Sequence, residues 1–320
     1  MTRRALVLSS GGARGSFEVG VLEELILNRG LDFHIFCGIS AGALNTSVLA
    51  QARFDPNPSA SVENLKQVYL SLRNLWLREI TGNRSIFCKR LLGILRIPLG
   101  ADSLYTVQPL ENILKRSVDP QKLAQSNRDL RIQYVALETG ELCTVKGDDP
   151  NILKKVLASA TVPFFFPPVR LDGKHLVDGG VRDNTPLGTA FDSEPPPEEI
   201  YVIYASPVKL EREDFTVIMN AQHYVMRSLE ILLNEIDITD VDGARQLNTL
   251  KKNWEEVKPL VPADHPAVKG MNSVLDPIKF ARIIGCRPEK LFTKDGLNFD
   301  PTEIRNNYEH GKEMGALIPK

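Results

Sequence analysis

The sequence has few of the residues that build disulfides or metal sites. Its 320 residues include four cysteines and five histidines, and these form no C-x-x-C pair and no H-x-x-x-H pair. Scattered cysteines in a chain of this length are typical of free thiols in a reducing compartment. We therefore expect reduced cysteines, no metal site and no cofactor.

Long apolar runs and a strong net charge are also missing. The apolar residues that follow Arg3 and Arg4 cover only positions 5–8, which is shorter than the apolar region of a secretory signal. No stretch approaches the roughly 18 apolar residues of a membrane-spanning helix. The formal net charge is −1, so no overall positive field attracts nucleic acid. We expect a cytoplasmic protein without a nucleic-acid partner.

The N-terminal part of the chain alternates between two patterns. Residues 5–9 and 33–37 are short apolar runs that lead into glycine-containing turns, as buried parallel strands do. Apolar residues at helical spacing predict a helix over 16–28, and a stretch rich in small residues, which allow close packing, is predicted as a second helix over 40–52. A strand–helix–strand–helix order implies right-handed crossovers. We therefore predict an α/β fold, with a mainly parallel central sheet covered by helices on both faces.

The rest of the chain continues this pattern and then becomes helical. We predict helices over 62–80, 215–258 and from 300 onwards, paired strands over 132–137 and 142–145, and further strands over 176–178 and 200–205. Asp300 is predicted to cap the last helix, with Pro301 in the first position and Glu303 in a capping box. Residues 1–208 are predicted to form the core, and residues 209–320 a mostly helical C-terminal extension packed on it.

A serine lies between two glycines at the end of the second predicted strand. The segment GISAG, residues 38–42, has the G-x-S-x-G spacing of a strand-to-helix elbow that exposes a serine nucleophile. Gly38 and Gly42 would avoid clashes with the neighbouring strand and helix. Because this spacing also arises by chance in glycine-rich loops, Ser40 needs a base and an oxyanion site elsewhere in the chain.

Four interpretations were compared for the glycine turn after the first strand, SSGGARG at residues 9–15. A dinucleotide site would need glycine at position 10 and an acidic residue at the end of the second strand, and neither is present. An oxyanion hole fits, because consecutive glycines at a strand end leave backbone N–H groups unobstructed. A plain tight turn fits as well. A phosphate-binding P-loop is excluded, because its lysine is absent.

The base is better sought among the carboxylates than among the histidines. In α/β hydrolases the serine follows several strands and the histidine comes late, whereas Ser40 comes early, and no histidine lies in a motif. His34 merely precedes Ser40 on the same strand. Asp178 ends a short apolar strand in HLVDGGVRDNTP, residues 175–186, and the two glycines after it allow another backbone to approach closely. Asp178 alone fits a turn former equally well; paired with Ser40 it fits a base.

Several segments resemble those of the bacterial patatin-like phospholipases. The main ones are SGGARG (10–15) as the oxyanion loop, GISAG (38–42) as the elbow and DGG (178–180) with the aspartate. The segments ASATVPFFFPPV (158–169) and RSLEILLNEIDITDVDGARQLN (227–248) are also similar to that family. The resemblance is specific over about residues 1–208 and looser beyond them.

The resemblance implies a lipid acyl hydrolase that works through a Ser-Asp dyad and an acyl-enzyme, without a histidine or a cofactor. Ser40 would be the nucleophile and Asp178 the base. The oxyanion hole would comprise Gly11, Gly12, Ala13 and Arg14, and the supporting motif glycines would be Gly15, Gly38, Gly42, Gly179 and Gly180. Ser10 stands where the family usually has the first of three glycines, and its β-carbon could narrow the loop.

The substrate class stays open at this point. Residues 81–105 combine basic and apolar side chains, which fits either a cap that touches anionic lipid surfaces or ordinary packing. The phenylalanines at 164–166 fit either an acyl pocket or the core. The expected partner is a lipid or another acyl ester, with peripheral membrane contact as an option, and nothing indicates the oligomeric state. The alternatives are an acyltransferase with the same dyad and a catalytically silent lipid-binding or regulatory protein.

Overall fold

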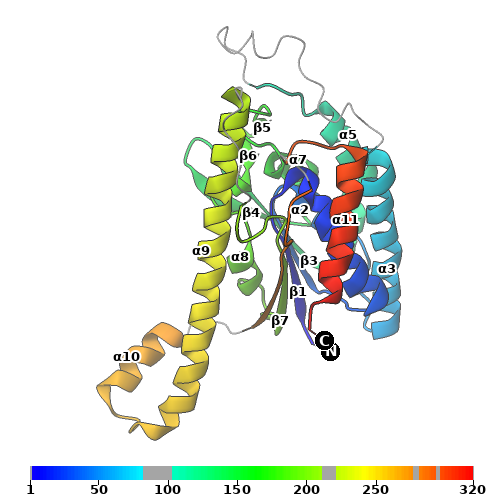
Figure 1. Cartoon of the computed structure of the whole chain (residues 1–320). Helices are drawn as coiled ribbons and strands as arrows, with labels where there is room; N and C mark the ends of the chain where they lie inside the picture. The colour runs from blue at the N-terminus through cyan, green and yellow to red at the C-terminus, as the bar shows by residue number, and fades with distance from the viewer. Residues whose placement is uncertain (1, 82–102, 211–220, 277–280, 293–295, 320) are drawn as a thin grey trace.

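The centre of the molecule is a mixed, mostly parallel sheet (Figure 1). The computed structural model describes residues 2–81, 103–210, 221–276, 281–292 and 296–319. Within these residues the strand order is β5-β6-β3-β2-β1-β7-β8, with β4 beside β3. The strands are β1 (Arg4–Leu8), β2 (Ile35–Gly38), β3 (Asp129–Ala136), β4 (Glu141–Lys146), β5 (Val169–Leu171), β6 (Lys174–Asp178), β7 (Glu199–Ile203) and β8 (Arg282–Cys286).

Strand β1 lies inside the sheet, between two parallel neighbours. It pairs with β2 on one side and with β7 on the other, and β2 pairs in parallel with β3. Its side chains alternate between two separate hydrophobic clusters, with Leu6 and Leu8 in one and Ala5 and Val7 in the other. Because successive side chains of a strand point to opposite faces, both faces of the sheet are buried. This confirms the predicted strands and the parallel core.

Helices cover both faces of the sheet, as predicted. The α-helices within the described residues are α1 (Gly15–Leu22), α2 (Ala41–Leu49), α3 (Pro58–Asn74), α5 (Gln108–Ser117), α6 (Pro120–Gln125), α7 (Ile152–Ser159), α8 (Leu187–Phe191), α9 (Ala221–Val257), α10 (Pro266–Leu275) and α11 (Pro301–Ala316). The larger cluster joins α1, α2 and α3 to one face, and Leu187 and Ala190 of α8 pack on the other. Helices α1 and α3 continue as the π-helical segments Glu23–Asn28 and Leu75–Ile80.

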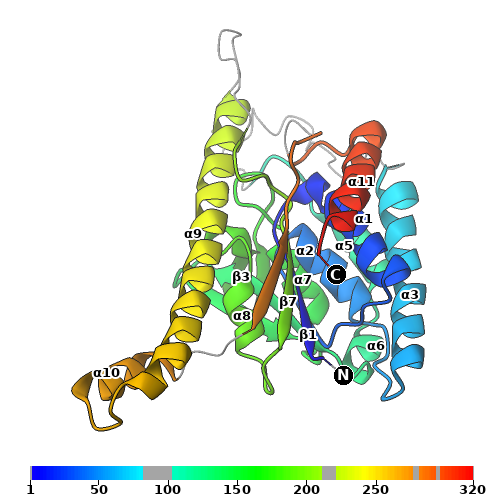
Figure 2. The same ribbon diagram turned by 60° about the horizontal axis from the view of Figure 1, so that its bottom comes forward.

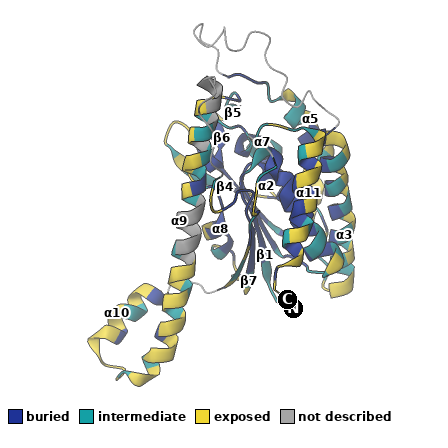
Figure 3. Cartoon of the chain, viewed as in Figure 1, coloured by how far each residue is buried: buried dark blue, intermediate teal, exposed yellow. Residues whose placement is uncertain are grey.

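The part of the chain after residue 208 returns to the sheet. Strand β8 pairs in parallel with β7, and α11 lies along α1 (Figure 2). The sequence did not predict β8, and the boundary at residue 208 stays a prediction. The N-cap of α11 is confirmed, because Asp300 Oδ1 accepts the Thr302 N–H at 2.8 Å. Helix α9 runs beside the sheet, and its C-terminal end with α10 projects from the body as an exposed arm (Figure 3).

Two features considered from the sequence concern membranes, namely a cap over residues 81–105 and membrane-spanning helices. Residues 82–102, nearly all of the predicted cap, lie outside the described residues. No described helix combines the length and the apolar character needed to cross a membrane.

Candidate active site

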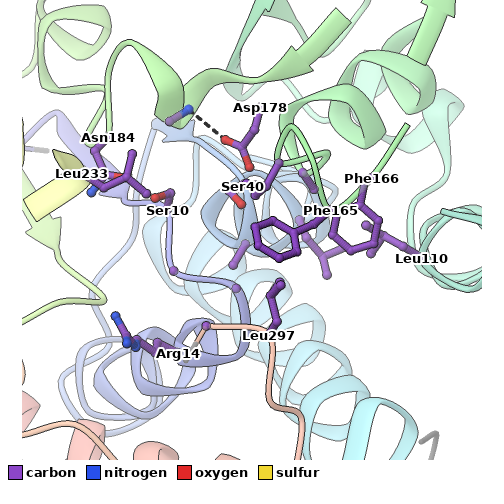
Figure 4. Close-up of a pocket in the computed structure, with 18 of the residues that line it drawn as sticks. Ser10, Arg14, Ser40, Leu110, Phe165, Phe166, Asp178, Asn184, Leu233 and Leu297 are labelled. Atoms are coloured by element: carbon purple, nitrogen blue, oxygen red, sulfur yellow. Dashed lines mark hydrogen bonds between the residues drawn. The ribbon is translucent and has the colours of Figure 1, made fainter. Parts of the chain in front are cut away.

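Strand β3 brings Ser40 and Asp178 together. Strand β4 occupies one edge of β3 along residues 131–136, so the other edge must serve both β2 and β6. Strand β2 runs along the first half of this edge and ends with Gly38 opposite Ile132, while β6 runs the opposite way and ends with Asp178 opposite Tyr134. The two strands therefore end facing each other, and Ser40, just beyond β2, meets Asp178 (Figure 4).

The backbone of Ser40 has the conformation of a strained elbow. Its φ is 56° and its ψ is −120°, in a region that costs a non-glycine residue free energy of the order of 1–3 kcal/mol. The flanking glycines are needed for close approach, because a β-carbon on Gly38 would lie 2.4 Å from the Gly42 carbonyl oxygen and one on Gly42 would lie 2.4 Å from that of Leu8. The Ser40 N–H donates to Ser159 Oγ at 3.0 Å. The tight turn thus fixes the Ser40 side chain at the carboxyl edge of the sheet.

Asp178 is a buried carboxylate with one fixed and one open oxygen. Its side chain accepts the Gly180 N–H on Oδ1 at 2.8 Å, and Oδ2 has no hydrogen-bond partner among the described residues. Burial raises the pKa of Asp178 to about 7, against smaller opposing effects of the Gly180 N–H and the nearby Ser40 hydroxyl. A carboxylate with this pKa is a far better proton acceptor at neutral pH than an exposed aspartate. Gly179 starts the turn that brings the Gly180 N–H back to Asp178.

The glycine loop after β1 offers two backbone donors. No described residue accepts a hydrogen bond from the N–H groups of Gly11 and Gly12, and both residues line the cavity that contains Ser40. The N–H of Ala13 donates to the Gly296 carbonyl at 2.7 Å, and that of Arg14 donates to the Gly11 carbonyl at 3.0 Å. The N–H groups of Ala13 and Arg14 thus have acceptors within the protein, whereas those of Gly11 and Gly12 have none among the described residues.

The loop is packed so closely that position 12 accepts only glycine. Gly12 has a φ of +55°, and a β-carbon there would lie 2.0 Å from the Gly296 carbonyl oxygen. Gly15, the last glycine of the motif, begins α1 directly after the loop.

Ser10 makes two hydrogen bonds that the sequence did not predict. Its hydroxyl donates to Asn184 Oδ1, and its N–H donates to the Asn184 carbonyl at 3.0 Å. Asn184 lies shortly after Asp178 in the chain. The two hydrogen bonds of Ser10 therefore connect the oxyanion loop to the segment that contains the candidate base. Asn184 and Ser159 were not singled out from the sequence, because a lone Asn or Ser within a loop or helix gives no distinct signal.

A cavity of about 170 Å³ opens over Ser40, with a polar end and an apolar end (Figure 4). The apolar end is built by side chains from several helices and loops, namely Leu44, Trp76, Ile80, Leu110, Ile113, Val162, Phe165, Phe166, Leu297 and Phe299. Phe165 and Phe166 therefore line the cavity, whereas Phe164 is 40% exposed and lies outside its lining. The polar end contains Ser10, Asn184, Ser206, Arg14, Arg227 and Glu230, and the apolar side chain of Leu233 lies beside Asn184 there (Figure 4).

The described histidines lie away from this cavity. His34 accepts the Arg4 N–H on its ring and packs on Phe54, and His175 pairs with Glu138 at 2.7 Å near the surface. None of the described residues that line the cavity is a histidine. Among the described residues there is also no group of three or more His, Cys, Asp or Glu side chains that could hold a metal ion.

The fold and the site together define an α/β protein of the patatin type, with a serine elbow, a buried aspartate and a glycine loop at one edge of the sheet. The family model described as patatin-like phospholipase matches residues 6–191, which is more than half of the chain. The chain belongs to the patatin-like phospholipase family, as its sequence resemblance predicted.

Its sequence relatives include proteins described as uncharacterized. One NTE family protein of Mycobacterium bovis and one of Mycobacterium tuberculosis are each 27% identical to this chain over 187 residues. The matched region covers 58% of this chain and 44% of each relative. The chain thus spans less than half the length of these relatives.

Solved structures with similar folds share little sequence with this chain. The match with VipD from Legionella pneumophila has a TM-score of 0.45 and 15% sequence identity. It covers 98% of this chain and 66% of the VipD chain. Human GIVD cytosolic phospholipase A2, in complex with methyl gamma-linolenyl fluorophosphonate, has a TM-score of 0.37 and 13% identity, covering 64% of this chain and 41% of its own.

Proposed function

We propose that this protein hydrolyses carboxylic esters of lipids, with Ser40 as nucleophile and Asp178 as base. The observation that carries the proposal is the pairing of a strained serine with a buried aspartate whose pKa is raised to about 7. Membership of the patatin-like phospholipase family supports the same class of reaction.

The first half of the reaction forms an acyl-enzyme. Asp178 Oδ2 takes the hydroxyl proton of Ser40 as Oγ attacks the ester carbonyl carbon. The carbonyl oxygen becomes an oxyanion, which accepts hydrogen bonds from the Gly11 and Gly12 N–H groups. The intermediate then collapses, the C–O bond to the alcohol breaks, and the proton passes from Asp178 to the leaving alcohol oxygen.

The second half releases the acyl group. A water molecule attacks the carbonyl carbon of the acyl-enzyme, and Asp178 accepts a proton from it. The same two N–H groups stabilise the second oxyanion. Collapse of this intermediate breaks the bond to Ser40 Oγ, which regains its proton from Asp178, and a free carboxylic acid leaves. A single carboxylate thus acts as base and then as acid in each half.

The cavity indicates an amphiphilic substrate. Its apolar end would bury an acyl chain, since burial of each methylene group contributes about 0.8 kcal/mol. Its polar end, with Ser10 and Asn184, would receive the alcohol part of the ester.

The test is hydrolysis of a panel of monoacyl and diacyl lipid esters in mixed micelles by the purified protein. Ser40→Ala should abolish release of fatty acid, whereas Ser71→Ala, which changes an exposed serine on α3, should leave it unchanged. Equal activity of wild type and Ser40→Ala would rule out this nucleophile. Absence of hydrolysis with every ester, despite a correctly folded wild type, would rule out the proposed activity.

A further inference from the structure

The oxyanion loop is held in place by residues that lie far beyond the family-matched region. That region ends at residue 191, yet the loop contacts Glu230 of α9 and Gly296 before α11. These contacts come from two different segments and act on two neighbouring residues of the loop, Arg14 and Ala13. The C-terminal part of the chain therefore forms part of the active-site wall.

The first contact is a nearly buried ion pair. The side chains of Arg14 and Glu230 are 6% and 12% exposed, and Arg14 Nη2 donates to Glu230 Oε1. The other carboxylate oxygen of Glu230 accepts from Arg227 Nη1 at 2.8 Å, one helical turn away on α9. Arg227 thus fixes the rotamer of Glu230, and Glu230 in turn fixes Arg14. An arginine at this depth needs such a partner, because an uncompensated buried charge is strongly destabilising.

The second contact is a backbone hydrogen bond. The Gly296 carbonyl accepts the Ala13 N–H at 2.7 Å and lies against Gly12, leaving no room for a side chain there. Because Gly11 and Gly12 have no side chains, the peptide groups of the loop have several accessible orientations. In some of them the N–H groups of Gly11 and Gly12 would turn away from Ser40. A loop fixed at Ala13 and at Arg14 cannot adopt these orientations without breaking a contact.

We propose that Glu230 is a positioning residue for the oxyanion hole, and that it acts through Arg14 to keep the Gly11 and Gly12 N–H groups directed at the substrate carbonyl. This inference rests on the proposed ester hydrolysis. It predicts an effect on the chemical step, because the oxyanion forms only during reaction and binding of the uncharged ester does not need the donors.

The main experiment compares Glu230→Gln with Glu235→Gln, which changes an exposed glutamate on the same helix. We expect Glu230→Gln to lower kcat at least tenfold while KM stays within twofold, and Glu235→Gln to leave both within twofold. A direct field effect would act in the opposite direction, since removing a negative charge near a developing oxyanion would raise kcat. An unchanged or raised kcat in Glu230→Gln overturns the inference.

Two further variants test the path of the effect. If Glu230 acts through Arg14, the double variant Arg14→Met/Glu230→Gln loses no more kcat than Arg14→Met alone; additive losses overturn that path. Gly296→Ala disturbs the loop from its other side, because the new methyl group would lie 3.1 Å from the Gly11 carbonyl oxygen. It should also lower kcat, whereas Gly270→Ala, where the space is open, should not.

Folding and function are separated by two reference measurements. Circular dichroism checks that each variant is folded; should Glu230→Gln fail to fold, Glu230→Asp, which keeps the charge on a shorter side chain, replaces it. A kcat loss at unchanged KM in Glu230→Asp supports the inference, and an unchanged kcat refutes it. Ser40-dependent hydrolysis by wild type is the reference for all of these comparisons. If wild type shows no Ser40-dependent hydrolysis, the proposed function is refuted. If wild type shows it and a Glu230 variant is fully active, only the positioning role of Glu230 is refuted.

Discussion

Replacing Asp178 with asparagine should remove activity and at the same time stabilise the protein at alkaline pH. Asparagine is nearly isosteric, so its Oδ1 can still accept the Gly180 N–H that Asp178 accepts at 2.8 Å. Its NH₂ group then takes the place of Oδ2 and donates to Ser40 instead of accepting a proton. Loss of a general base typically lowers the rate 10²–10⁴-fold, and we expect about a 10³-fold loss of kcat.

The effect on stability follows from the raised pKa. Burial lifts the pKa of Asp178 from the ordinary 3.8 to about 7, so the folded state binds this proton more tightly than the unfolded state. The contribution of Asp178 to the free energy of unfolding therefore falls as pH rises from about 4 to about 7. With about 1.4 kcal/mol for each pH unit, wild type loses about 2–3 kcal/mol between pH 5 and pH 8 that Asp178→Asn does not lose.

The assay is urea unfolding of wild type and Asp178→Asn at both pH values, together with ester hydrolysis at pH 8. The stability of the variant relative to wild type should rise by about 2–3 kcal/mol from pH 5 to pH 8. Asp172→Asn changes an exposed aspartate in the turn between β5 and β6 and serves as the control. The reasoning fails if the stability difference is the same at both pH values, or if Asp178→Asn keeps more than a tenth of the activity.

Three further predictions concern the surroundings of the dyad. Ser10→Gly should keep kcat within about threefold, because the backbone hydrogen bond from residue 10 to Asn184 at 3.0 Å remains; a tenfold loss, about 1.4 kcal/mol, would give the hydroxyl its own role. His34→Gln and His175→Gln should each keep most of the hydrolysis, since neither ring lines the cavity; a folded but inactive variant would exclude a histidine-free dyad. Leu110→Trp should lower kcat/KM for long-chain p-nitrophenyl esters relative to the acetate, because residue 110 lines the apolar end; an unchanged ratio would place the acyl chain elsewhere.

The parts of the fold that the sequence predicted are those with local causes. The strand at β1 is an apolar run that ends in glycines, and the elbow is marked within its own segment, because a β-carbon on Gly38 would lie 2.4 Å from the Gly42 carbonyl oxygen. Asp300 caps α11 through its own neighbours. Each of these features depends on residues close in sequence, so a single segment carries the whole signal.

The missed features depend on partners that are distant in sequence. Strand β8 is the stretch RIIGC, in which a glycine interrupts the apolar pattern, so it was not recognised without its partner β7. Asp178 and Ser40 could be paired by family resemblance, but the reason that they meet is the shared edge of β3. Ala13 was predicted as part of the oxyanion hole, but the contact of its N–H with Gly296 could not be predicted from the segment around Ala13.

The same holds for Glu230. Its position in a long predicted helix distinguishes it in no way from the other acidic residues of that helix, such as Glu235. Its contact with Arg14 exists only because α9 passes beside the loop that follows β1. The sequence pattern of one helix does not indicate which distant residue its side chains contact.

The most direct measurement of the central claim is the reaction of the purified protein with a fluorophosphonate probe, followed by mass mapping of the labelled peptide. The account predicts label on Ser40 alone, at a rate that rises with pH through a single ionisation near 7, and a large loss of labelling in Asp178→Asn. Label on another serine, or undiminished labelling of Ser40 in Asp178→Asn, would contradict it.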